Sequence, residues 1–154
     1  VMGIDNNSGV AFLKAMQSDG YTVPKEGTAF VSIADIDKKR SLPIIKGLVK
    51  LNFNIIATKG TAEFFKKNDI ECTSIFKVGE GRPNVVDEIL NDNIQLVINT
   101  PIGAQSRYDE EAIGKNSVMK NILTITTLSG AKAAIAAMSN LDKVNVKPLQ
   151  EYFK

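Results

Sequence analysis

The architecture of this 154-residue chain is indicated most clearly by one segment, Asn54-Ile55-Ile56-Ala57-Thr58-Lys59-Gly60-Thr61-Ala62. Its short apolar part, Ile55–Ala57, is rich in β-branched residues and predicts a strand buried on both faces. Gly60 would let the backbone turn tightly and let a ligand approach. The helix that follows begins with unpaired N–H groups and the positive end of its dipole, which favours a dianion such as phosphate. Ordinary helix capping by Thr58 or Thr61 is the alternative interpretation.

Strands and helices alternate along the rest of the chain. We predict strands over residues 28–33, 53–57, 71–76, 95–100 and 122–127. We predict helices over residues 35–51, 60–68, 83–91, 106–120 and 128–140, with a short helix near the C-terminus. In the first of these helices Ser41 could form a new cap before Pro43, because proline is tolerated in a first turn. Alternation with short connections predicts a three-layer α/β/α domain built on a five-stranded parallel sheet.

The first 27 residues have a separate character. Residues 1–4 look like the end of a strand, and a helix over residues 8–16 has an apolar side with Ser8 as its predicted N-cap. Residues 21–27 form a linker that contains Pro24. We therefore expect residues 1–20 to be the tail of a preceding domain and the main domain to begin at residue 28. Packing of the helix on that following domain is the alternative.

Composition excludes several classes of function. Apolar residues make up 44% of the chain and charged residues 23%, as in ordinary globular domains, and the net charge of +2 calls for no nucleic-acid or membrane partner. No apolar run is long enough to span a membrane. The chain has no histidine, which excludes Ser-His-Asp catalysis and histidine metal sites. The single cysteine, Cys72, excludes an internal disulfide and fits a reducing cytoplasm.

Polar residues follow four of the predicted strands. They are Ser32 and Lys38 after the first strand, Thr58, Gly60 and Thr61 after the second, Lys77 after the third, and Asn99 and Thr100 at the end of the fourth. The carboxyl ends of parallel strands meet at one edge of a sheet, where α/β proteins bind their ligands. Two lysines, hydroxyl groups, an amide and a helix N-terminus therefore predict one cleft for an anionic small molecule.

Three motifs in order resemble a known family: Ala57-Thr58-Lys59-Gly60-Thr61, Lys77-Val78-Gly79-Glu80-Gly81-Arg82-Pro83 and Ile98-Asn99-Thr100. The chain resembles the methylglyoxal-synthase-like fold, and more narrowly the C-terminal allosteric domain of the large subunit of carbamoyl phosphate synthetase. Thr126-Thr127-Leu128 is similar to that subgroup as well. The resemblance covers roughly residues 28–154, and residues 1–16 resemble the end of the preceding synthetase domain.

The resemblance implies a regulatory domain with strand order 3-2-1-4-5 that binds a nucleotide monophosphate effector. Family members bind UMP as an inhibitor and, in some cases, IMP as an activator, and so adjust carbamoyl phosphate synthesis for the pyrimidine and arginine pathways. The domain itself would hold no cofactor, metal or catalytic residue. The complete cytoplasmic relative is a ligase that uses ATP and Mg, and its partners are the other synthetase domains and a glutaminase small subunit.

Matching positions give the residues that the resemblance implies for the site. The effector phosphate would be bound by Lys38, Thr58, Gly60, Thr61 and Lys77. The base and ribose side would contact Asn99 and Thr100, with Ser32, Arg82 and Thr126 as further candidates. Two positions depart from the family pattern. Pro101 stands where the family often has a second threonine and lacks both a hydroxyl and an N–H. Thr124 replaces the tyrosine of ornithine-activated members.

Two other functions fit parts of the sequence. A methylglyoxal-synthase-type lyase would use the same phosphate cleft, but it needs a carboxylate base and a histidine, and residues 99–101 supply neither. A structural or oligomerisation domain could use the alanine-rich helix over residues 128–140. A dinucleotide-binding Rossmann domain is not indicated, because no Gly-x-Gly-x-x-Gly follows the first strand.

Overall fold

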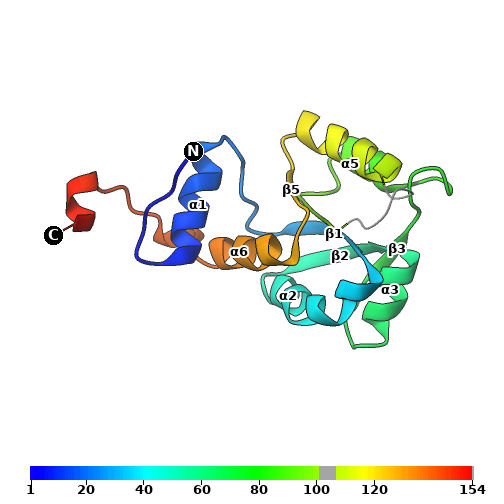
Figure 1. Cartoon of the computed structure of the whole chain (residues 1–154). Coiled ribbons are helices and arrows are strands. Elements are labelled where there is room, and N and C mark those ends of the chain that lie inside the picture. The colour runs from blue at the N-terminus through cyan, green and yellow to red at the C-terminus, as the bar shows by residue number, and fades with distance from the viewer. Residues whose placement is uncertain (101–106, 154) are drawn as a thin grey trace.

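A five-stranded parallel sheet forms the centre of the molecule (Figure 1). The computed structural model describes residues 1–100 and 107–153. The strands are β1 (Gly27–Ile33), β2 (Phe53–Thr58), β3 (Thr73–Ile75), β4 (Leu96–Thr100) and β5 (Leu123–Ile125). Their order is β3-β2-β1-β4-β5, and every neighbouring pair is parallel. The predicted fold class and strand order are confirmed.

Helices cover both faces of this sheet. They are α1 (Ser8–Ser18), α2 (Lys38–Lys50), α3 (Lys59–Lys66), α4 (Val85–Leu90), α5 (Arg107–Met119) and α6 (Leu128–Met138). Strand side chains alternate between the faces. Ala29 and Val31 of β1 face a core shared with α1, α2, α3 and α6. Phe30, between them, faces a second core shared with α4 and α5. The result is a three-layer α/β/α arrangement.

Helix α1 packs directly on α6 (Figure 1). Leu13 and Met16 of α1 belong to the same core as the sheet. A Cβ on Gly9 would lie 2.7 Å from the backbone oxygen of Ala136, so the two helices approach closely at that point. The structure therefore shows the alternative arrangement, in which this helix packs on the following part of the chain. The assignment of residues 1–20 to a preceding domain stays a prediction.

The N-terminal segment differs from the prediction in its details. Residues 1–4 are irregular rather than the end of a strand. Helix α1 is capped by Asn7, whose side chain accepts hydrogen bonds from the N–H groups of Gly9 and Val10. Ser8, the predicted cap, is the first helical residue. Asparagine and serine both cap helices well, and the sequence offered both in succession.

Helix α2 begins later than predicted and contains its proline. Asp35–Asp37 form a separate 3₁₀ turn, and α2 then runs without interruption from Lys38 to Lys50. Pro43 lies inside the helix, and Ser41 is buried and donates a hydrogen bond to the Lys38 carbonyl. The prediction of a new cap at Ser41 was wrong, because the first turn of α2 already forms at Lys38, before the proline.

Elements at the edges of the sheet are shorter than predicted. Strand β3 covers only Thr73–Ile75, and Phe76 adds an isolated bridge to Asn84. Helix α4 begins at Val85 rather than at Pro83, because Asn84 caps it in a capping box with Asp87. The predicted short C-terminal helix is a 3₁₀ turn over Leu149–Phe153. An edge strand pairs with a neighbour on one side only, and this limits the length of β3 and β5.

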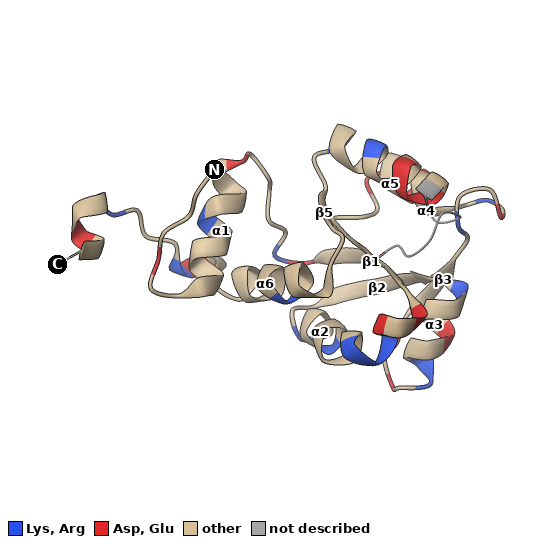
Figure 2. Cartoon of the chain, in the orientation of Figure 1, with Lys and Arg blue, Asp and Glu red and all other residues tan. Residues whose placement is uncertain are grey.

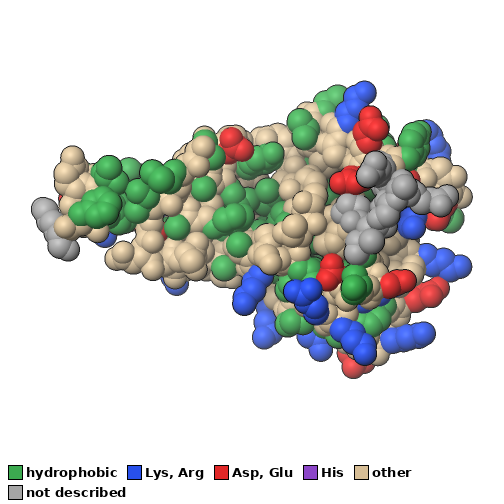
Figure 3. Space-filling model, in the orientation of Figure 1, with side chains coloured by type: hydrophobic (Ala, Val, Ile, Leu, Met, Phe, Trp, Pro, Cys, Tyr) green, Lys and Arg blue, Asp and Glu red, His purple; other side chains and the backbone are tan. Residues whose placement is uncertain are grey.

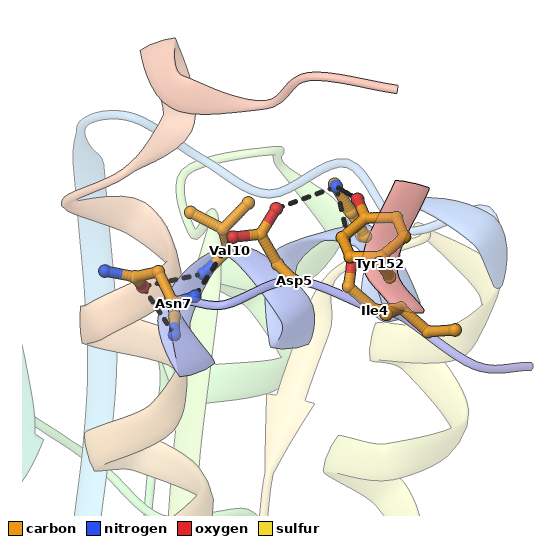
Figure 4. Close-up of polar contacts among 7 residues, drawn as sticks. Ile4, Asp5, Asn7, Val10 and Tyr152 are labelled. Atoms are coloured by element: carbon orange, nitrogen blue, oxygen red, sulfur yellow. Dashed lines mark hydrogen bonds and ion pairs between the residues drawn. The ribbon is translucent and has the colours of Figure 1, made fainter. Parts of the chain in front are cut away.

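The C-terminal turn folds back onto the N-terminal segment through Lys14. The Lys14 ammonium donates to Asp5 Oδ2 and to the Tyr152 hydroxyl, both at 2.8 Å, and to the Ile4 carbonyl oxygen at 3.2 Å. It also lies 5.4 Å from the centre of the Tyr152 ring. Figure 4 shows Ile4, Asp5 and Tyr152 converging on this group. These contacts, which we call the Lys14 cluster, join the two ends of the described chain.

Three further observations concern the cysteine, metal binding and membrane insertion. Cys72 is buried, and burial raises the pKa of its thiol. Across residues 1–100 and 107–153, no group of three or more carboxylate or cysteine side chains could hold a metal ion. In the same ranges no helix has the length and apolar character that crossing a bilayer requires.

Candidate functional site

A cleft of about 550 Å³ lies at the carboxyl ends of the central strands. Eight of the predicted site residues line it, from four different strand ends. They are Ser32, Lys38, Thr58, Gly60, Thr61, Lys77, Asn99 and Thr100. Figure 2 shows lysine and arginine positions along α2 and α3, and Figure 3 shows lysine and arginine side chains gathered on the same part of the surface. The structure therefore brings these residues together, as the sequence predicted for a parallel sheet.

Lys38 is held at the cleft by two contacts. Its ammonium donates to the Gly60 carbonyl oxygen at 2.9 Å and forms an ion pair with Asp35 at 2.6 Å. The side chain is 17% exposed, so its aliphatic part is packed and its charge is fixed in position. The hydrogen bond and charge of Lys38 hold the pKa of Asp35 below its ordinary value. The cleft thus has one well-positioned cation with a carboxylate beside it.

The N-terminus of α3 forms the floor of the site. Thr58 is the N-cap residue, but its side chain makes no capping hydrogen bond to the helix. Its hydroxyl donates instead to Thr61 Oγ1 at 3.2 Å, and Thr61 Oγ1 accepts from the Ile33 N–H at 3.3 Å. Both threonines are buried. The capping alternative from the sequence is wrong for both residues, and Thr58 can rotate its O–H toward a phosphate oxygen.

Gly60 is the second residue of α3. Its φ lies outside the left-handed region, so the backbone conformation does not require glycine, contrary to the sequence-based expectation of a tight turn. A Cβ at this position would lie 3.6 Å from Lys38 Nζ. Glycine therefore keeps open the space next to the Lys38 ammonium, which fits the other expectation, that a ligand approaches here.

Lys77 lies on the loop after β3, where the chain turns sharply. Its N–H bonds the Glu80 carboxylate at 3.2 Å, and its carbonyl accepts from the Glu80 N–H at 3.2 Å. Both residues lie near Asp109 of α5. Burial raises the pKa of Asp109, the charge of Lys77 opposes this, and Glu80 adds to it. The side chain of Lys77 is exposed and its charge reaches the cleft.

Strand β4 supplies the buried polar side of the cleft. Asn99 and Thr100 are 7% and 6% exposed. Thr100 Oγ1 accepts a hydrogen bond from the Ala34 N–H at 3.1 Å and so ties the end of β4 to the residue after β1. Ser32 pairs with Asn99 in the sheet register, which places the two side by side at the cleft. Pro101 lies outside the described residues.

Two predicted residues do not line the cleft. Arg82 is exposed and lies 3.8 Å from Asp87 of α4. Thr126 follows β5 and is exposed before the start of α6. Neither is among the described residues that form the cleft wall. Thr124 lies in β5 and donates its hydroxyl to the Ile122 carbonyl.

The structure adds cleft residues that sequence reasoning missed. They are Phe30, Ile33, Ala34, Asp35, Ile36, Val78, Val85, Asp109 and Ile113. Phe30 and Val85 give the cleft an apolar wall. Asp109 is a carboxylate that can accept hydrogen bonds from hydroxyl groups. Asp35 could have been predicted, because it follows the end of β1. Asp109 could not, because no local signal in the sequence indicates that the start of α5 lies at the cleft.

The fold and the cleft define an α/β domain with a polar cleft at the carboxyl ends of its parallel strands. A family model described as the MGS-like domain matches residues 40–126. The chain therefore belongs to the MGS-like domain family, which confirms the resemblance seen in the sequence.

Curated relatives place the chain among known sequences. It is 45% identical over 152 residues to a carbamoyl phosphate synthase large chain of Acidobacterium capsulatum, which covers 97% of this chain and 14% of that protein. It is 41% identical over 160 residues to the C-terminal section of such a chain from Aquifex aeolicus, covering 99% of this chain and 30% of that one. The corresponding section from Methanopyrus kandleri is 45% identical over 139 residues, with coverages of 90% and 26%. The chain thus spans less than a third of these relatives.

Proposed function

We propose that this chain is the C-terminal regulatory section of a carbamoyl phosphate synthase large chain and that its cleft binds a phosphorylated nucleotide. UMP as an inhibitor, or IMP as an activator, is the proposed effector. The observation that carries this proposal is the convergence of Lys38, Lys77 and the N-terminus of α3 on one cleft. Its volume of about 550 Å³ lies within the usual range for small-molecule sites.

Each part of the cleft has a role in this proposal. Lys38 and Lys77 supply positive charge, and the first turn of α3 supplies N–H donors for a phosphate group. Thr58 and Thr61 add hydroxyls at the phosphate end. Asn99 and Asp109 lie along the cleft and could bond the base and the sugar hydroxyls.

Regulation would follow from linkage. An effector shifts a synthase between two states only by its differential affinity for them, typically about 1–3 kcal/mol of coupling. In this proposal the complete chain is an ATP- and Mg-dependent ligase in the cytoplasm, this section holds no catalytic residue, and the partners are the other synthetase domains and a glutaminase subunit. The product would feed pyrimidine and arginine synthesis.

The test is calorimetric titration of the chain with UMP and with IMP. Lys77→Ala is expected to abolish nucleotide binding, a loss of at least about tenfold, because it removes one of the two cations at the phosphate. The fold should persist, since Lys77 is exposed.

Lys39→Ala is the matched control. Lys39 is exposed, directly follows Lys38 and does not line the cleft. It carries the same charge, so a general effect of net charge would weaken binding equally in both variants. Unchanged UMP and IMP affinity in Lys77→Ala would contradict the proposed site.

A lyase of the methylglyoxal-synthase type is a second candidate, because the structure places a carboxyl group in the cleft. Burial raises the pKa of Asp109, as a general base requires. The chain supplies no histidine beside it. Incubation with dihydroxyacetone phosphate and measurement of methylglyoxal tests this candidate. We expect no product above the level of the Asp109→Asn variant.

A further inference from the structure

Asp35 forms an ion pair with Lys38, one of the two cations that the proposed function assigns to the effector phosphate. The residue lies on the 3₁₀ turn between β1 and α2, lines the cleft, and places Oδ1 2.6 Å from Lys38 Nζ. Its side chain is 93% exposed, whereas that of Lys38 is 17% exposed. The cation is therefore fixed and the carboxylate is free to turn away. This asymmetry distinguishes the pair from a structural salt bridge, in which both partners are held.

The geometry leaves little of Lys38 for a second anion. An ammonium has three N–H donors. One donor is directed at the Gly60 carbonyl oxygen at 2.9 Å and another at Asp35. A phosphate on the third donor would lie only a few ångströms from the Asp35 carboxylate, and the two negative charges would repel each other.

The electrostatics of the cleft agree with this geometry. The pKa of Asp35 is lowered by the hydrogen bond from Lys38 first, and the charge of Lys77 lowers it further. Asp35 is therefore ionised at neutral pH and experiences both cations that the proposed function assigns to the phosphate.

We propose that Asp35 is a built-in competitor for Lys38 that weakens the binding of anions to the cleft and so sets the effector concentration to which the domain responds. A ligand phosphate must displace the carboxylate from the Lys38 ammonium, and the exposed Asp35 side chain then turns toward water. The inference rests on the proposed function and adds to it a residue that opposes binding rather than contributing to it.

The experiment compares Asp35→Asn with the wild-type chain by calorimetric titration with UMP and with inorganic phosphate. Asparagine keeps the shape of the side chain and removes its charge. We expect both ligands to bind about three- to tenfold more tightly, because a repulsive charge next to the phosphate has been removed. The thermal midpoint should change little, since Asp35 is exposed.

Asp37→Asn is the matched control. Asp37 lies two residues away, pairs with Arg40 at 3.3 Å and does not line the cleft. The substitution changes the net charge by the same amount as Asp35→Asn, but it does so outside the cleft. We therefore expect the affinity for UMP and phosphate to rise by less than about twofold. A second control repeats Asp35→Asn in a Lys38→Met background with inorganic phosphate, where the gain should shrink because the contested cation is gone.

The outcomes separate this inference from the proposed function. Equal gains in Asp35→Asn and Asp37→Asn, or weaker binding in Asp35→Asn, would overturn the competition while UMP binding by the wild-type chain still supported the effector site. Weaker binding would instead make Asp35 a residue that positions Lys38. If the wild-type chain bound none of UMP, IMP and inorganic phosphate, both proposals would fail.

Discussion

Two threonine hydroxyl groups at the cleft also stabilise the fold. Thr61 accepts a hydrogen bond from the Ile33 N–H, and Thr100 accepts one from the Ala34 N–H. These two N–H groups lie at the end of β1, where the chain leaves the sheet. Loss of either hydroxyl would leave a donor unpaired at a cost of about 1–3 kcal/mol. The ammonium groups of Lys38 and Lys77 make no hydrogen bond to the end of β1. Substitution of these lysines is therefore the better probe of ligand binding.

Gly60→Ala separates binding from stability at one residue. Alanine is favoured over glycine inside a helix by up to about 1 kcal/mol, and the new methyl group would meet Lys38 Nζ at an ordinary contact distance of 3.6 Å. We therefore expect an unchanged or higher thermal midpoint together with UMP affinity that falls several-fold, because the methyl fills the space beside the cation. Thermal unfolding and calorimetry on the same sample measure the two effects.

Gly114→Ala serves as the control for that substitution. Gly114 lies in α5, and a Cβ there would meet no atom within 4 Å. It should gain helix stability in the same way and leave nucleotide affinity unchanged. Equal affinity in the two alanine variants and the wild-type chain would show that no ligand approaches Gly60.

The sequence could predict some residues of the site but not others. Lys38, Thr58, Thr61 and Lys77 were predictable, because each follows a strand whose end must lie at the ligand-binding edge. Asp109 was not, because it lies at the start of α5 and reaches the cleft only through the packing of that helix on the sheet. Arg82 was assigned by motif alone, and the structure turns it toward Asp87 instead.

The contact between α1 and α6 depends on small side chains. Gly9 of α1 faces the backbone of Ala136, and the alanines Ala131, Ala134 and Ala137 of α6 are fully buried. Small residues allow two helices to approach closely, which explains the alanine-rich sequence of α6 without a partner protein. The oligomerisation alternative drew on the same alanines, and their burial within the chain removes that support.

Gly9→Ala should loosen this pair of helices. The added Cβ would lie 2.7 Å from the Ala136 backbone oxygen, too close for any real contact, so α1 must shift. Overpacking of this kind costs about 1–3 kcal/mol. Chemical denaturation measures the loss as a lower midpoint. Ser8→Ala, at the exposed neighbouring position, should stay within about 0.5 kcal/mol of the wild-type chain.

Element boundaries were less predictable than the elements themselves. The β-branched runs fixed the central strands β1, β2 and β4 closely. The edge strands β3 and β5 came out at three residues each. Their apolar sequence extends further, but pairing with a single neighbour determines where a ladder ends. Helix α2 began at Lys38 because Asp35–Asp37 closed a separate 3₁₀ turn, which the helical periodicity does not distinguish.

Across the whole molecule, the N-terminal and C-terminal segments lie on the same side, away from α3 and β3 (Figure 1). The Lys14 cluster joins the N-terminal segment, α1 and the C-terminal turn through one ammonium group. The pKa of Asp5 is lowered, chiefly by the hydrogen bond from Lys14, and the pKa of Lys14 is raised, chiefly by the hydrogen bond to Asp5. Both shifts favour the ionised pair over a wide range of pH.

The C-terminal turn should therefore loosen in acid. The folded-state pKa of Asp5 lies below its unfolded value, so its contribution is complete above about pH 4 and is lost as the pH falls through the folded value. Hydrogen exchange over residues 149–153, corrected for intrinsic rates, should be constant from pH 7 to about pH 5 and rise below about pH 4. Protection of this turn that persists in acid until the sheet itself unfolds would contradict a role for Asp5.

Tyr152→Phe tests the other half of the cluster. Phenylalanine keeps a ring near Lys14 and removes the hydroxyl that accepts its hydrogen bond. We expect faster exchange of the same turn already at pH 7, with the protection of the sheet unchanged. Exchange as slow as in the wild-type chain would show that the ring alone holds the turn.

The burial of Cys72 has a practical consequence. It is the single cysteine of the chain, it is 7% exposed, and the pKa of its thiol is raised by burial. The thiolate is the nucleophile that attacks a maleimide, so we expect the native protein to react only slowly with maleimides. A cysteine introduced at an exposed position would be the one fast-reacting group, and a dye attached beside the cleft could report ligand binding by fluorescence without removal of the native residue.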